Sequence, residues 1–174
     1  MGSAIYHAFR KPVISQLLAL ATISILLAGC AGTREIKTRV HYPDSNAVVR
    51  YALSLQGAPY RYGAESPREG FDCSGFVKHV YERHGVRLPR TAHQIAAAVP
   101  RIDSRNRQPG DLVFFNTTGQ PFSHVGIYVG NDSFVHSSSV RGQVIVSSLE
   151  RPYWWDRFLG VRRPSFPDRF VSHR

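Results

Sequence analysis

The sequence is poor in cysteine, with Cys30 and Cys73 the only two among its 174 residues. Two cysteines exclude a mini-protein held together by several disulfides and any zinc module that needs four thiolates. The sequence also has no His-Glu-x-x-His and no Cys-x-x-Cys motif, and no carboxylate stands beside His124 or His136. We therefore expect neither a metal ion nor any other cofactor.

Internal repeats and low-complexity tracts are absent as well. Hydrophobic residues make up 43% of the chain and aromatic residues 11%, which is enough for a hydrophobic core. The length allows one domain of ordinary size with an appendage, but not two full domains. The net charge of +10 indicates an anionic partner without identifying it. The basic residues are scattered and no nucleic-acid-binding motif accompanies them, so we expect no nucleic-acid partner.

Acidic residues are missing from residues 1–30, which differ in composition from the rest of the chain. Arg10-Lys11 is followed by an apolar run over residues 13–28 that ends in small residues. A basic start, an apolar middle and a small-residue end are typical of a secretory signal peptide, predicted here over residues 1–29. The apolar run of 16 residues is short for a bilayer span, so an uncleaved membrane anchor is the less favoured alternative.

The end of this segment, Leu27-Ala28-Gly29-Cys30, resembles the lipobox of bacterial lipoproteins. The resemblance implies that the thiol of Cys30 receives a diacylglyceryl group and anchors the mature chain to a membrane. Ala31, in place of Asp, implies the outer membrane, with the protein facing the periplasm. Without residues 1–29 the net charge is +8. The polar residues 30–46 are predicted to form a flexible tether.

Once Cys30 carries lipid, Cys73 is the only thiol left in the chain. An unpaired cysteine in an exported protein indicates a reactive group, although a buried and inert cysteine is a common alternative. An apolar stripe of helical spacing over residues 76–81, a good N-cap at Asp72 and a stop at Gly85 place Cys73 in the first turn of a helix. The helix dipole there favours the thiolate, as a cysteine nucleophile requires.

Gly75, in the same first turn, costs the helix about 1 kcal/mol, which indicates that another group approaches the backbone there. His79 and His84 lie on the same helix but too far along it to reach the sulfur, and we expect both to be solvated. His93, near the start of the next predicted helix, is also expected on the surface.

Two other histidines stand in strand-like segments. Apolar and polar residues alternate over residues 123–130 and again over residues 133–136, with a turn at Gly130-Asn131-Asp132 between them. A hairpin of this kind holds His124 and His136 near one another on adjacent strands. One imidazole can then face the sulfur as a base while the other orients it.

With these residues in place, the sequence is identified as resembling the NlpC-type cell-wall cysteine peptidases, over about residues 48–163. Lipoprotein members of that family resemble the whole layout, leader included. The resemblance rests on six motifs in the family's order: Gly57-Ala58-Pro59-Tyr60-Arg61-Tyr62-Gly63, Phe71-Asp72-Cys73-Ser74-Gly75-Phe76-Val77, Leu88-Pro89-Arg90-Thr91-Ala92 with Gln94, Pro109-Gly110-Asp111-Leu112-Val113-Phe114-Phe115, His124-Val125-Gly126-Ile127-Tyr128-Val129-Gly130 and Phe134-Val135-His136.

The resemblance implies that Cys73 is the nucleophile, His124 the general base and later acid, and His136 the residue that orients it. It also implies that the hydroxyl of Tyr60 helps to stabilise the oxyanion, although Tyr60 could instead be a core aromatic residue. The resemblance further implies that Asp72 and Ser74, which flank the nucleophile, help to hold the free amine or polar backbone of the stem peptide. They could alternatively serve only as a helix cap and as a partner for a backbone N–H.

Arg90 could be a solvated arginine or could meet a substrate carboxylate, and the sequence does not separate the two. One departure from the family pattern is Ala64, where a second glycine is usual, and another is the charged loop over residues 65–69. These two departures affect the expected substrate preference and not the expected catalytic chemistry.

For the fold we expect the α+β class, with a papain-like core in which N-terminal helices pack on an antiparallel sheet. The domain is predicted over residues 47–163, followed by a loose basic tail over residues 164–174. Trp154 and Trp155 are expected to pack at the edge of the last strand, although one could line the cleft. Helices are predicted over residues 45–56, 73–84 and 91–98, and strands over residues 111–115, 124–129, 133–137, 144–147 and 158–163.

The function predicted from all of this is hydrolysis of an amide bond in the stem peptide or cross-bridge of peptidoglycan, by a monomeric Cys-His-His enzyme. One alternative is a catalytically silent lipoprotein that binds murein. Another is a papain-like amidase or acyltransferase that acts on a different substrate.

Overall fold

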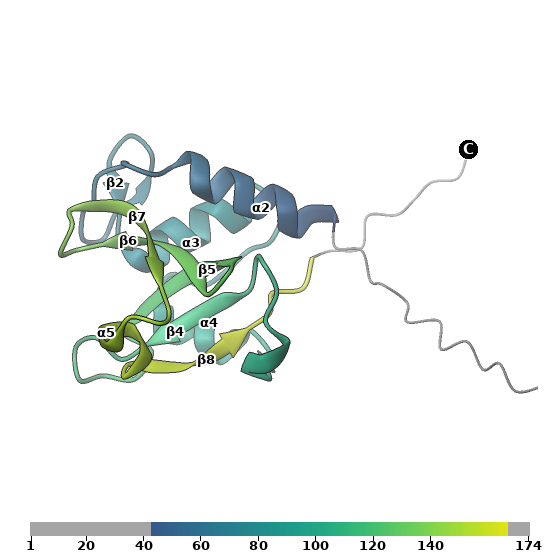
Figure 1. The fold of residues 1–174 in the computed structure, drawn as a ribbon. Helices are drawn as coiled ribbons and strands as arrows, with labels where there is room; N and C mark the ends of the chain where they lie inside the picture. The colour runs from purple at the N-terminus through teal and green to yellow at the C-terminus, as the bar shows by residue number, and fades with distance from the viewer. Residues whose placement is uncertain (1–42, 167–174) are drawn as a thin grey trace, which may run out of the picture. The chain divides into compact units, whose positions relative to one another are not determined.

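The structure is a computed structural model that describes residues 43–166 (Figure 1). The predicted signal peptide over residues 1–29, Cys30, the tether up to residue 42 and the tail from residue 167 lie outside the described residues. Among the helices of residues 43–166, none is long and apolar enough to cross a membrane.

The described part of the chain confirms the α+β class. Its helices are α2 (Pro43–Ser54), α3 (Cys73–Glu82), α4 (Ala92–Ala98) and α5 (Pro152–Trp155), with a 3-10 turn at Ser104–Asn106. An antiparallel six-stranded sheet has the order β3 (Arg101–Ile102), β8 (Phe158–Arg162), β4 (Leu112–Phe115), β5 (His124–Gly130), β6 (Ser133–Ser138) and β7 (Gln143–Ser148). A small separate ribbon pairs β1 (Glu65–Ser66) with β2 (Gly70–Phe71).

The three predicted helices and five predicted strands are all present, with ends shifted by one or two residues. The helix α2 begins at Pro43, inside the segment predicted to be tether, because proline suits the first turn of a helix. The elements that the sequence analysis missed are the ribbon, β3 and α5, all too short to carry a periodic pattern.

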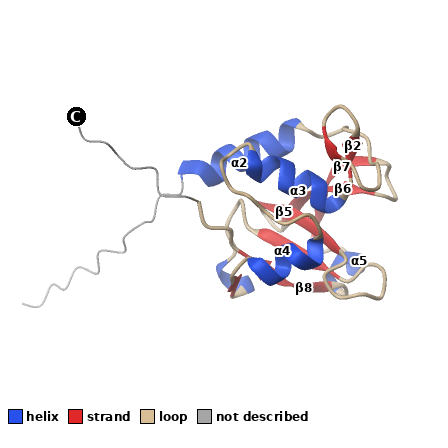
Figure 2. Ribbon diagram, turned by 180° about the vertical axis from the view of Figure 1, so that it is seen from behind, coloured by secondary structure: helices blue, strands red, loops and turns tan. Residues whose placement is uncertain are grey.

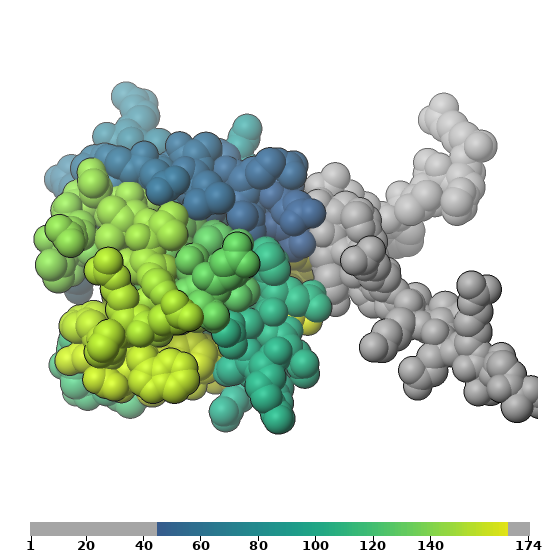
Figure 3. Space-filling model, viewed as in Figure 1, coloured from purple at the N-terminus to yellow at the C-terminus, as the bar shows by residue number. Residues whose placement is uncertain are grey.

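The sheet carries a hydrophobic core on each face. Along β4, Leu112 and Phe114 join the larger core beneath α2 and α3, whereas Val113 and Phe115 point to the smaller core on the other face. Figures 1 and 2 show α2 and α3 side by side across the sheet at β5. In the space-filling view, α2 lies above the β6–β7 hairpin and the α5–β8 segment (Figure 3). Successive side chains along a strand point to opposite faces of the sheet, and this alternation divides the apolar side chains of β4 between the two cores.

The hairpin that joins β5 to β6 is as predicted and has a two-residue turn. Asn131 and Asp132 have φ angles of 49° and 50°, as a type I′ turn requires, and asparagine and aspartate tolerate this region well. The turn pairs Gly130 with Ser133, and a register shift between Tyr128 and Gly130 then pairs Tyr128 with Phe134 and Ile127 with Val135. The positions of the two hairpin histidines follow from this register.

The start of the predicted tail packs against the domain. Pro164 is buried, and the ring of Phe166 stacks on Tyr81 with 6.1 Å between the ring centroids. The expectation of a loose tail is therefore wrong for residues 164–166, because Phe166 supplies an aromatic ring to the larger core.

Candidate active site

Cys73 is the first residue of α3, where two local features of the sequence place it. The Asp72 carboxylate caps the helix by accepting a hydrogen bond of 2.7 Å from the backbone N–H of Gly75. A Cβ atom at Gly75 would lie only 2.2 Å from the carbonyl oxygen of Ala64. The predicted cap and the predicted close approach are both confirmed, and the glycine lets the chain before β1 lie against the helix start.

The sulfur of Cys73 lies against the start of β5. Its Sγ is 4.0 Å from the carbonyl oxygen of Ser123, to which the thiol donates. Burial raises the pKa of Cys73 to about 11, and the negative charge of Asp72 adds to this. The backbone N–H groups of Val125 and Ser74 lower the pKa, but more weakly. The expectation that the helix start depresses this pKa is therefore wrong, since loss of solvation outweighs the backbone hydrogen bonds to the sulfur.

His124 and His136 meet as the hairpin predicts. Nε2 of His124 is 2.8 Å from Nδ1 of His136, and the two rings are nearly perpendicular. Nε2 of His136 is in turn 3.0 Å from Oγ of Ser147 on β7. Burial lowers the pKa of His124 to about 4, and burial together with the neighbouring His124 lowers that of His136. Both imidazoles are therefore neutral at pH 7, each with one donor and one acceptor nitrogen.

An aromatic cluster encloses this histidine pair. The indole of Trp154 lies 5.4 Å from the His124 ring and 4.9 Å from the His136 ring, between centroids. Phe115 and Phe134 complete the cluster at 4.7 Å and 5.0 Å from the same indole. The position of Trp154 could not be assigned from the sequence, where the only signal was a tryptophan pair before the last strand. Trp155 is 72% exposed and takes no part.

The three other histidines of residues 43–166 differ in exposure: His79 and His84 are half-buried, and His93 is on the surface. His79 was expected to be solvated, but it is half-buried, 2.9 Å from the hydroxyl of Tyr51 and packed against Phe71, and burial lowers its pKa. His84 is also half-buried, with its ring edge-on to Tyr51. Both expectations are wrong, because α2 covers this side of α3 through Tyr51. His93 is exposed, as expected.

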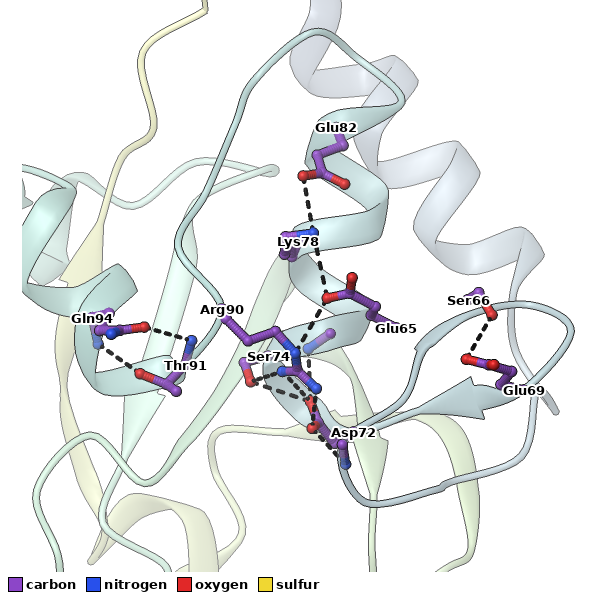
Figure 4. Close-up of polar contacts among 12 residues, drawn as sticks. Glu65, Ser66, Glu69, Asp72, Ser74, Lys78, Glu82, Arg90, Thr91 and Gln94 are labelled. Atoms are coloured by element: carbon purple, nitrogen blue, oxygen red, sulfur yellow. Dashed lines mark hydrogen bonds and ion pairs between the residues drawn. The ribbon is translucent and has the colours of Figure 1, made fainter.

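Asp72 is the centre of a charged network beside Cys73 (Figure 4). Arg90 binds its carboxylate with both terminal nitrogens, at 2.6 Å and 3.1 Å, and also donates to Oγ of Ser74 at 3.0 Å. The backbone N–H of Gly63 donates to the same carboxylate at 3.0 Å. Burial opposes ionisation of Asp72, but the hydrogen bonds from Arg90 and the backbone outweigh it and hold the pKa below its usual value.

Glu65 extends this network along α3. Its carboxylate lies 3.2 Å from Nε of Arg90 and 3.3 Å from Lys78, which also pairs with Glu82 at 3.0 Å (Figure 4). Arg90 is therefore a paired arginine, held by two carboxylates rather than simply solvated. The charged loop noted in the sequence contributes directly to the surroundings of the nucleophile.

A cavity of about 690 Å³ brings most of the predicted residues together. His136 does not line the cavity but lies behind His124. Burial raises the pKa of Tyr60, and the neighbouring ionisable groups of Cys73 and Asp72 add to this, so its hydroxyl stays protonated and able to donate. The predicted site residues that line the cavity are Tyr60, Asp72, Cys73, Ser74, Arg90 and His124.

The cavity is lined by both a thiol and a neutral imidazole that has one nitrogen already bonded, and these are the groups that a cysteine nucleophile and its base require. Within residues 43–166, no three His, Cys, Asp or Glu side chains are grouped so that they could hold a metal ion.

The sequence model of the NlpC/P60 family matches residues 57–163 of this chain. The chain belongs to the NlpC/P60 family. Members of this family are cysteine peptidases, in agreement with the arrangement of Cys73 and His124.

Relatives of this NlpC/P60 protein include three from Escherichia coli. Probable endopeptidase NlpC is 41% identical over 80% of this chain and 94% of its own length. Murein DD-endopeptidase MepS/Murein LD-carboxypeptidase is 33% identical over 88% of this chain and 95% of its own length. Murein DD-endopeptidase MepH is 42% identical over 64% of this chain, but the chain spans only 42% of MepH.

Solved structures of the family are similar in fold. A lipoprotein-like NLP/P60 protein of Staphylococcus aureus has a TM-score of 0.65 and 32% identity, covering 73% of this chain and 43% of the other. The NlpC/p60 domain of the peptidoglycan hydrolase SagA has a TM-score of 0.58 and 28% identity, covering 68% and 97%. The shared part is the domain that holds Cys73 and the histidine pair.

Proposed function

We propose that this chain is a murein endopeptidase that hydrolyses an amide bond in the stem peptide or cross-bridge of peptidoglycan. The observation that carries the proposal is the cavity that both Cys73 and His124 line, with His124 hydrogen-bonded to His136 at 2.8 Å. The names of MepS and MepH, murein DD-endopeptidases, support murein as the substrate.

The first step is transfer of the Cys73 thiol proton to His124 as the sulfur attacks the amide carbonyl. Because the pKa of Cys73 is raised and that of His124 lowered, both groups are neutral before substrate enters. The proton therefore moves during the attack rather than before it. The backbone N–H of Cys73 and the hydroxyl of Tyr60 then stabilise the oxyanion of the tetrahedral intermediate.

In the second step the imidazolium of His124 donates its proton to the leaving amine, and the acyl group remains on Cys73 as a thioester. A water molecule that gives its proton to His124 then attacks the thioester and releases the acid product. His136 holds the His124 ring throughout, so that the same nitrogen takes and returns the proton.

Asp72, Ser74 and Arg90 form the substrate-binding side of the proposed site. All three line the cavity beside the nucleophile, and the Arg90 side chain is 34% exposed although it binds Asp72. Four of its five N–H groups already face Asp72, Ser74 and Glu65, and the remaining N–H can donate to a carboxylate or carbonyl oxygen of a stem peptide. In this proposal Asp72 acts mainly by orienting Arg90 and Ser74, since its own oxygens already accept several hydrogen bonds.

The proposed location is the periplasmic face of the outer membrane, with a lipid on Cys30 as the anchor. The lipobox and Ala31 support it, and the net charge of +8 after removal of residues 1–29 helps a monomeric enzyme to stay on an anionic wall. Replacement of Cys30 by Ser should move the protein from the membrane fraction to the soluble fraction. A variant that stays with the outer membrane would contradict the lipid anchor.

Digestion of purified sacculi tests the function, with muropeptide release followed by mass spectrometry. Cys73→Ala should abolish release while its thermal unfolding stays close to that of the wild type, and the masses released by the wild type identify the bond. Full activity of Cys73→Ala would end the cysteine-peptidase proposal. Wild-type protein that binds sacculi without cleaving them would be a silent binding protein, and turnover of acyl substrates alone would indicate an amidase or acyltransferase.

A further inference from the structure

We infer that Ser147 is a positioning residue of the active site, which accepts the last hydrogen bond of a chain that runs from His124 through His136. By ending this chain, Ser147 keeps Nδ1 of His124 available to take the proton of Cys73. The inference rests on the proposed peptidase function, and neither the family motifs nor the roles assigned above include Ser147.

The geometry places three polar side chains in a row across three neighbouring strands. His124 stands on β5, His136 on β6 and Ser147 on β7, with 2.8 Å and 3.0 Å between successive polar atoms. In the β6–β7 register Ser147 is opposite Phe134, two residues from His136. Partners in an antiparallel pair share a sheet face, so Ser147 is a diagonal neighbour of His136 on the same face.

The direction of the proton chain follows from the chemistry of neutral imidazole. Nε2 of His124 is engaged with His136, which leaves Nδ1 as the nitrogen that acts as base. A neutral imidazole carries one proton, so a free Nδ1 requires the proton on Nε2, from which it is donated to Nδ1 of His136. His136 then carries its own proton on Nε2 and donates it to Oγ of Ser147.

The opposite direction is unproductive. If His136 donated from Nδ1 to His124, the proton of His124 would be on Nδ1 and that nitrogen could not accept one from Cys73. The Ser147 hydroxyl can serve either direction while both rings are neutral. Once His124 has become an imidazolium it holds protons on both nitrogens, and only the direction that ends on Ser147 remains. The Ser147 hydroxyl is therefore needed most as an acceptor when His124 becomes an imidazolium.

The surroundings offer few substitutes for this acceptor. The rings of Phe134 and Trp154 lie 4.8 Å and 4.9 Å from the His136 ring, and the buried side of the pair is apolar. The titratable group that acts on His136 is His124, with a smaller opposite effect from the backbone of Ser137. Loss of the Ser147 hydroxyl would remove the side-chain hydrogen-bond partner of His136 Nε2, beside a ring that must become cationic.

Three variants of the full-length protein test the inference. Ser147→Ala removes the acceptor, and Ser147→Thr keeps a hydroxyl on a residue type that suits a strand. Ser148→Ala is the matched control, because the neighbouring hydroxyl of Ser148 accepts from the backbone N–H of Glu150 and not from a histidine. Each is assayed for kcat/KM on purified sacculi and by nitrogen-15 NMR of the histidine rings at pH 7.

Ser147→Ala should lower kcat/KM by about 10-fold, the rate change that corresponds to the loss of one hydrogen bond from the transition state. Ser147→Thr should restore most of that loss, and Ser148→Ala should match the wild type. In the spectra of the wild type both hairpin histidines should carry the proton on Nε2. In Ser147→Ala a fraction of His136 should shift to the form with the proton on Nδ1.

Wild-type activity in Ser147→Ala would overturn the inference, and so would a wild-type His136 that carries its proton on Nδ1. A Thr variant as weak as the Ala variant would also overturn it, since the hydroxyl would then not be the group that matters. If the wild type releases no muropeptides, the proposed function fails instead, and the spectra still decide whether Ser147 sets the proton position of His136.

Discussion

The indole of Trp154 packs over the His124 ring, with 5.4 Å between centroids and 31° between the ring planes. An aromatic face attracts a cation, so this contact favours the imidazolium that forms during catalysis over the neutral ring. The same indole closes one side of the bond between His124 and His136, where a low local dielectric strengthens that bond.

We expect Trp154→Ala to lower kcat/KM on sacculi by about 10-fold, because exclusion of water and the attraction for the imidazolium are lost together. Trp154→Phe should lose less, since a smaller ring still covers the pair. Steady-state digestion of sacculi measures this, with Trp155→Ala as a control because that side chain is 72% exposed. An equal loss in the Trp155 variant would show that the effect is not specific to the covered histidine.

We expect Tyr60→Phe to lower kcat by about 100-fold with little change in KM, because its hydroxyl is assigned to the oxyanion and not to the bound substrate. Tyr62→Phe is the control, since its side chain is 88% exposed at the same cavity. A change in KM alone would instead place the Tyr60 hydroxyl on the substrate before reaction.

We expect Arg90→Ala to destabilise the domain by about 1–2 kcal/mol, measured by chemical denaturation, because the Asp72 carboxylate would lose its bidentate partner. Arg90→Lys should recover only part of the stability, because the ammonium group restores the positive charge but cannot bind both carboxylate oxygens of Asp72. The control is Arg105→Ala, which breaks an exposed ion pair with Asp103 and should leave stability unchanged. Equal stability of the Arg90 and Arg105 variants would contradict a structural role for the network.

We expect alkylation of Cys73 by iodoacetamide in the free protein to be slow at pH 7 and to rise towards pH 11. The thiolate is the reactive form, and burial raises its pKa to about 11. Labelling rates measured against pH by mass spectrometry test this. The denatured protein serves as the reference, because its exposed thiol should titrate near the usual value. A rate that is already constant below pH 7 would contradict a neutral resting thiol.

The residues of the active site could be predicted where short-range patterns define them. Asp72 as a cap and the turn between the two histidine strands are local features, and both were found from sequence alone. The pKa of Cys73 was predicted in the wrong direction, because burial depends on how β5 packs against α3 and is not visible in the residues around the cysteine.

The partners that come from distant segments could not be predicted for the same reason. Trp154 reaches His124 from α5, the short helix between β7 and β8, and Ser147 reaches His136 only through the register of β6 and β7. A single serine or tryptophan carries no pattern that distinguishes this use from a surface position. Arg90 is similar, since only the folded chain brings it onto Asp72.

Cys73 begins a helix in the first half of the domain, whereas His124 and His136 stand on a hairpin formed from the second half. A partly folded chain therefore holds a thiol that has no base. Amide hydrolysis can begin only when α3 has docked on the finished sheet, which delays the onset of cutting until the whole molecule is assembled. In the proposed murein endopeptidase, cutting therefore requires the completed fold.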